Sequence, residues 1–196
     1  MDAWCAFLGR LATDAEAALA AAMAYRELDD AARDVWIAAL DQDIGRVAAP
    51  RIAVYAPLLA VETDPDRRSR VVRAIGPVDP AAAPRALAHA LSGVAPGGLR
   101  IAALIVPLYL DFVQVLACAY RSGGGFEWVK HDPIVSREQA PSPGAELGGA
   151  RVEATPLPAV IDDLAAAIVA QVRTGRPLPE ALRVFADLFG PTPEGA

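Results

Sequence analysis

The sequence predicts a mainly α-helical (α+β) protein, folded as a single domain over residues 1–196, and three observations support this fold class. Alanine, the residue with the highest helix propensity, is the most frequent residue of the chain. Apolar residues recur at steps of three and four through most of the chain, as on the buried face of a helix. Between residues 99 and 135 this periodicity gives way to a dense apolar run and a cluster of glycines. We therefore expect a helical bundle or a short α-solenoid-like array, with a small β-hairpin or extended insert near residues 100–135.

The N-terminal part, residues 3–91, is expected to form five helices joined by short connections. Asp29 and Asp30 can cap the second helix, and Asp64 followed by Pro65 is a strong signal for the start of the fourth. Pro57 lies inside the third helix and should kink or split it. The expected helices span about 3–27, 30–44, 50–62, 65–75 and 80–91.

The apolar segment and extended arm, residues 99–135, can be interpreted as helix or as strand. A buried helix over about 107–121 would place Asp111, Gln114 and Cys118 on one polar stripe. Alternatively, the β-branched run before Pro107 would form a buried strand that the proline ends, and the glycines after Ser122 would turn a hairpin. We expect a mixture: a strand or extended piece near 100–106, a helix or strand through 110–121 and an extended return over 126–135.

Residues 101–120 also meet the bare length and hydropathy criterion for a membrane span, because Asp111 is their one charged residue. Pro107, Asp111 and Gln114 would then lie near the middle of the bilayer, where an uncompensated charge costs several kcal/mol. One arginine at each end provides no orientation signal. Membrane association through 101–120 therefore remains only a second alternative.

The C-terminal part begins with a connector rich in Pro, Gly and Ser, about 136–150, and a short extended piece over 151–157. A helix pair follows within residues 158–189. Its first helix, about 158–174, should turn a set of large apolar residues inward: Val160, Ile161, Leu164, Ile168 and Val172. The second, about 179–189, should bury Leu182, Phe185 and Leu188.

Composition restricts the functional classes. The net charge is −6 and is spread evenly, so we do not expect nucleic-acid binding. Cys5 and Cys118 lie far apart in apolar surroundings and should be buried, reduced thiols. The N-terminus lacks the features of a secretory signal, so we expect a cytoplasmic protein. The scarcity of lysine beside abundant arginine and alanine is typical of a GC-rich, bacterial genome.

No catalytic motif is present in the sequence: it contains no nucleophile elbow, phosphate-binding loop or dinucleotide fingerprint. No catalytic residue, metal ligand set or cofactor is therefore expected. If the chain is an enzyme or a small-molecule-binding domain, its pocket should lie around residues 107–131, and its side chains should be Asp111, Gln114, Arg121 and His131.

The sequence favours a non-enzymatic function, an accessory or adaptor subunit that acts through protein–protein interaction in a larger complex. The aromatic arm after the glycines, with Phe126, Trp128 and Lys130, has the composition of an interface anchor. We expect a protein partner or a homo-oligomer.

Overall fold

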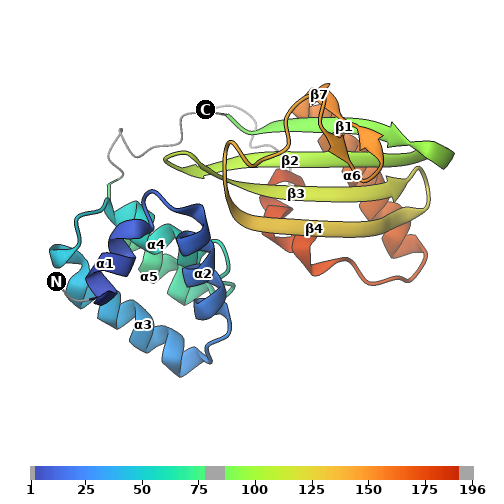
Figure 1. Ribbon diagram of the computed structural model, residues 1–196. Helices are drawn as coiled ribbons and strands as arrows, with labels where there is room; N and C mark the ends of the chain where they lie inside the picture. Colours follow the sequence, from blue (N-terminus) through green and yellow to red (C-terminus); the bar gives the residue numbers. More distant parts are fainter. Residues whose placement is uncertain (1–2, 78–86, 190–196) are drawn as a thin grey trace. The chain divides into compact units, whose positions relative to one another are not determined.

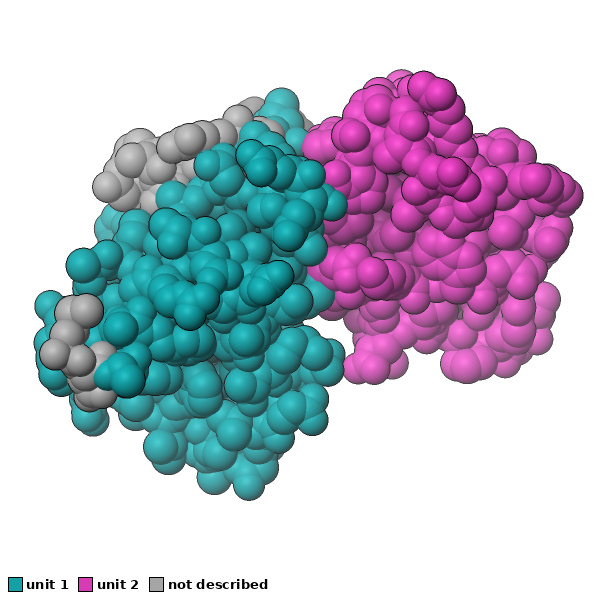
Figure 2. All heavy atoms as spheres, in the orientation of Figure 1, with its two compact units in different colours: residues 1–87, 107–114, 133–139 teal, residues 88–106, 115–132, 140–196 magenta. Residues whose placement is uncertain are grey.

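The computed structural model describes residues 3–77 and 87–189 and divides into two compact units (Figures 1 and 2). Unit 1 comprises residues 1–87, 107–114 and 133–139. Unit 2 comprises the remaining segments, 88–106, 115–132 and 140–196. From residue 88 onward the chain therefore forms unit 2, except for two short segments, 107–114 and 133–139, that return to unit 1.

The described part of unit 1 consists mainly of helices: α1 (Ala3–Arg10), α2 (Ala15–Arg26), α3 (Asp30–Asp43), the 3₁₀ turn η1 (Ile44–Arg46), α4 (Arg51–Leu59) and α5 (Pro65–Ile75). Asp14, Asp29 and Asp64 cap α2, α3 and α5, and each carboxylate accepts a hydrogen bond from the backbone N–H three residues later. The predicted caps at Asp29 and Asp64 are confirmed. The single helix predicted over 3–27 is wrong, because the chain turns at residues 11–13 and Asp14 starts a new helix.

The core of unit 1 combines helix residues with strand ends. Tyr25, Tyr55 and Leu58 are almost fully buried in it. Tyr109 and Phe112, which flank the turn between two strands, pack in the same cluster with their rings at 88° and 5.2 Å between centroids. Unit 1 is therefore a helical array completed by a β-hairpin end.

A five-stranded antiparallel sheet has the order β4-β3-β2-β1-β7 (Figure 1). Its strands are β1 (His89–Ala95), β2 (Leu99–Tyr109), β3 (Phe112–Arg121), β4 (Gly125–Ser136) and β7 (Glu153–Thr155). Leu91 of β1 lies opposite Ala103 of β2 and Ala154 of β7. The turn between β2 and β3 has two residues and places Leu110 at a φ of 50°.

Helix α6 (Leu157–Arg173) covers one face of the sheet within unit 2 (Figure 1). Val160, Leu164 and Ala167 on its inner face pack in one cluster with residues of β1–β4. The 3₁₀ helix η4 (Glu180–Phe185) adds Leu182 and Phe185 to that cluster and leads into α7 (Ala186–Phe189). The predicted burial of Leu182 and Phe185 is confirmed, whereas Leu188, predicted to be buried as well, is half-buried.

A small hairpin of β5 (Glu146–Leu147) and β6 (Ala150–Arg151) crosses the face of the sheet opposite to α6. A Cβ on Gly93 of β1 would lie 2.4 Å from the carbonyl oxygen of Arg151, so the crossing requires glycine there. A Cβ on Gly148 would lie 2.8 Å from the Trp128 ring. Both faces of the central strands are therefore covered by other parts of the chain.

The predicted helical bundle or solenoid-like array is wrong: the chain is a mixed α+β structure with a five-stranded sheet. The interpretation of residues 107–121 as a helix is also wrong, because they form the end of β2, a two-residue turn and β3. The two strands are buried on both faces, so they lack the polar–apolar alternation of a half-exposed strand. Pro107 lies inside β2 and does not end it.

The hairpin predicted around the glycines is confirmed, with β3 and β4 on either side and Gly123 at a φ of 75°. The predicted helix over 80–91 lies largely outside the described residues, and its last residues form part of β1. Residues 101–120 form strands, and no helix in the described ranges is both long and apolar enough to cross a membrane.

Candidate functional site

The four residues predicted to line a pocket lie along the β2–β4 hairpins. Asp111 is in the turn before β3 and lies 3.7 Å from the guanidinium of Arg137. Arg121 is at the far end of β3, where it donates hydrogen bonds to Glu127 and to the carbonyl oxygen of Gly97. A strand of ten residues is about 33 Å long, so Asp111 and Arg121 do not share one cavity. Gln114 is half-buried within β3, nearer to Asp111 in sequence.

His131 is the fourth of these residues and lies in β4, edge-on to the ring of Phe185 with 5.3 Å between centroids. Its Nε2 atom is buried and has no hydrogen-bond partner among the described residues. Burial lowers the pKa of the imidazole, and the nearby Asp132 carboxylate opposes this shift only in part. His131 is therefore a neutral packing residue, without a polar partner to orient it for acid–base chemistry.

The aromatic arm predicted as an interface is used largely within the chain. Phe126 is buried beside Tyr120, with 6.2 Å between ring centroids, and Trp128 is half-buried against Gly148. Lys130 is exposed and forms an ion pair with Asp132 at 3.0 Å. Phe126 and Trp128 turn inward because η4 and α6 cover one face of β4 and the β5–β6 hairpin covers the other.

Burial deactivates two nucleophilic side chains of unit 2, Cys118 and Tyr120. Burial raises the pKa of the Cys118 thiol to about 12 and that of the Tyr120 hydroxyl to about 12. Cys5 and Cys118 are both free and buried, as the sequence predicted. Within the described ranges, no three His, Cys, Asp or Glu side chains are grouped closely enough to hold a metal ion.

A dense polar cluster lies in unit 1 around the buried carboxylate of Glu62. This carboxylate accepts hydrogen bonds from the Tyr25 hydroxyl, the Arg67 guanidinium and the backbone N–H groups of Thr63 and Asp64. Burial alone would raise the pKa of Glu62, but these donors lower it to about 2. Because every lone-pair direction of the carboxylate is engaged, we interpret the cluster as structural.

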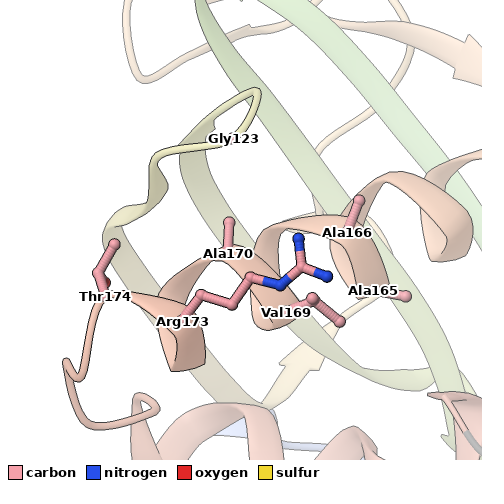
Figure 3. Close-up of a pocket in the computed structure, with 7 residues that line it drawn as sticks. All are labelled: Gly123, Ala165, Ala166, Val169, Ala170, Arg173 and Thr174. Carbon is pink, nitrogen blue, oxygen red and sulfur yellow. The ribbon is translucent and has the colours of Figure 1, made fainter.

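The outer face of α6 is a partly apolar, exposed surface that was not predicted from the sequence. Val169 is 48% exposed and Val172 is 57% exposed, although the inner face of the same helix is also apolar. Next to them is an open depression of about 480 Å³ (Figure 3). It is lined by Gly123, Ala165, Ala166, Val169, Ala170, Arg173 and Thr174.

The depression has an apolar floor and one charged side chain. Figure 3 shows Arg173 extended back along α6 toward Val169, while Gly123 approaches from the turn between β3 and β4. Gln171 anchors this turn, because its side-chain oxygen accepts a hydrogen bond from the backbone N–H of Phe126 and its nitrogen donates to the carbonyl oxygen of Pro177. The turn and the helix end are therefore held together.

One signal in the sequence could have revealed this face. Apolar side chains occupy nearly the whole circumference of α6, more than one buried face requires. The prediction placed Val172 inward together with Val160 and Leu164. In the structure Ala167 and Gln171 take the inward positions and Val172 faces solvent.

Comparison of this chain with models of known protein families, with curated proteins and with solved structures finds no match.

Proposed function

We propose that this protein is a non-enzymatic interaction module, an accessory or adaptor subunit that binds another protein chain through the outer face of α6. The observation that carries the proposal is the exposure of Val169 and Val172 beside an apolar depression. Contiguous apolar surface of this kind marks interaction sites on soluble proteins. The free, buried cysteines agree with a reducing compartment such as a bacterial cytoplasm.

The shape of the face favours a protein segment as the ligand. Ala165, Ala166 and Ala170 are small, so the backbone of a docked helix or strand can approach α6 closely. Completing the burial of Val169 and Val172 contributes about 1 kcal/mol each, since a fully exposed valine gains about 1.5–3 kcal/mol on burial. Helix α6 is held on the sheet by its inner face and by Gln171, so it is a rigid platform.

A photo-crosslinking amino acid at Ala166, in the cells that naturally produce the protein, tests the proposal. We expect crosslinked products at Ala166 that disappear when Val169→Glu is added. Val35→Glu is the matched control, because Val35 is 68% exposed on α3, and it should leave the products unchanged. Products that survive Val169→Glu, or that form from a crosslinker at Val35 but not at Ala166, would overturn the proposal.

A further inference from the structure

The outer face of α6 carries a stripe of four residues, Asp162, Ala166, Val169 and Arg173, and all four are exposed. They follow one another at steps of four, three and four residues, so they lie along one line of the helix surface. The same spacing is obtained when the stripe is followed in either direction. The charges at its two ends are opposite, and the two residues between them are one small and one large apolar side chain.

We infer that the partner that binds this face is a second copy of the chain, with the two α6 helices packed antiparallel. This inference rests on the proposed function, since it names the occupant of the same surface. A two-fold axis between residues 167 and 168 would place Asp162 opposite the partner's Arg173, and Ala166 opposite the partner's Val169. Each of these pairs would occur twice, as an isologous interface requires.

The charges of the stripe are available for this pairing. Asp162 and Arg173 form no ion pair with any residue that the structure describes, whereas the neighbouring Asp163 is bound to Arg100. Asp162 and Arg173 are eleven residues apart, about 16 Å along the helix, so they cannot reach each other within one chain. Antiparallel packing would bring them together and would also align the two helix macrodipoles in opposite directions.

The apolar centre of the stripe is equally self-complementary. Ala166 leaves a gap of the size that the partner's Val169 can fill, which is the small–large alternation of close helix packing. The depression beside Arg173 leaves room for the first turns of the partner's helix. A contact of this length falls below the roughly 1,200 Å² of stable complexes, so we expect a dimer of micromolar to millimolar dissociation constant.

Sedimentation equilibrium of the purified chain, over about 10 µM to 1 mM, tests the inference with charge reversals. Asp162→Arg and Arg173→Asp should each weaken self-association by at least about tenfold, because each places like charges in contact twice. The double variant should recover wild-type self-association to within about threefold. Glu27→Arg is the control, since its side chain is 75% exposed on unit 1 and the change in net charge equals that of Asp162→Arg.

The outcomes separate this inference from the proposed function. Both charge reversals oppose the macrodipole of α6 and could destabilise it, so thermal unfolding is measured for each variant to verify that it is folded. A wild-type chain that stays monomeric to 1 mM, or a double variant that stays as weak as the single ones, would overturn antiparallel pairing. If Ala166 crosslinks then remain sensitive to Val169→Glu and contain a different protein, the proposed function stands without a second copy.

Discussion

Glu62→Gln should destabilise unit 1 by about 3 kcal/mol at pH 7. Glu62 is 2% exposed, and the pKa of its carboxyl falls from its ordinary value of 4.5 to about 2 in the folded chain. One pKa unit corresponds to about 1.4 kcal/mol, so this shift amounts to about 3 kcal/mol of stability. The glutamine would retain acceptors for the backbone N–H groups but leave Arg67 without its buried anion.

The pKa shift of Glu62 also determines the pH range in which its carboxylate stabilises unit 1. A carboxyl whose pKa is lowered by folding contributes its full stability above the unfolded pKa, near 4.5. The contribution is lost as the pH falls from about 4.5 toward 2, because the folded state must then bind a proton it resists. The free energy of unfolding of the wild type should therefore decrease across this window, and that of Glu62→Gln should change much less.

Urea unfolding monitored by tryptophan fluorescence measures this free energy. In a Trp128→Phe background the remaining tryptophans, Trp4 and Trp36, both report unit 1. Glu27→Gln is the control, because its exposed ion pair with Arg26 should contribute less than about 1 kcal/mol. A loss below about 1 kcal/mol for Glu62→Gln, or an equal pH dependence with and without the carboxylate, would refute the assignment of Glu62 as the centre of the network.

Three further predictions concern unit 2. Gly93→Ala should lower the free energy of unfolding by about 1–3 kcal/mol, because the added Cβ would lie 2.4 Å from a backbone oxygen. Gly45→Ala is the control and should be neutral or stabilising, because the space around Gly45 is open. A neutral result for Gly93→Ala would contradict the crossing of β6 over β1. Gln171→Ala should cost about 1–3 kcal/mol in urea unfolding, since the buried N–H of Phe126 and the carbonyl oxygen of Pro177 lose their partner. An unchanged midpoint would contradict the anchoring role. His131 is neutral and its pKa is lowered, so wild-type stability should fall as the pH drops below about 6.5. His131→Phe should remove that component, and an unchanged pH profile would show that His131 is not its source.

The helices that the sequence predicted well are those with local signals. The starts of α3 and α5 depend on Asp29 and Asp64, whose carboxylates cap N–H groups only three residues away. α6 follows a proline and ends at a glycine with a φ of 70°, which is also a local pattern. Signals of this kind are complete within a dozen residues of sequence, so they can be read without knowing the rest of the fold.

The sheet could not be predicted in the same way. β1 has the sequence HALSGVA, which has weak strand propensity, and it forms between β2, which follows it directly, and β7, which comes from a distant part of the chain. β2 and β3 are covered on both faces, so their apolar runs resemble a buried helix as much as a strand. The arm containing Phe126 looked available to a partner because the segments that cover it follow later in the chain.

The α6 stripe was missed for a related reason. The inward set depends on the rotation of the helix about its axis, and in the structure Gln171 lies on the inward side, where it bonds Phe126 and Pro177. A buried glutamine is not expected from hydropathy alone. With Gln171 inward, Val169 and Val172 must face solvent, which creates the surface on which the proposed function depends.

Mixing the two single charge-reversal variants tests antiparallel α6 pairing most directly. Asp162→Arg makes both ends of the stripe basic, and Arg173→Asp makes both ends acidic, so neither variant should self-associate. In a one-to-one mixture every charged end would face an opposite charge across the two-fold axis. We predict heterodimers at least as strong as the wild-type dimer in sedimentation equilibrium. A mixture that sediments as the sum of two monomers would contradict the account.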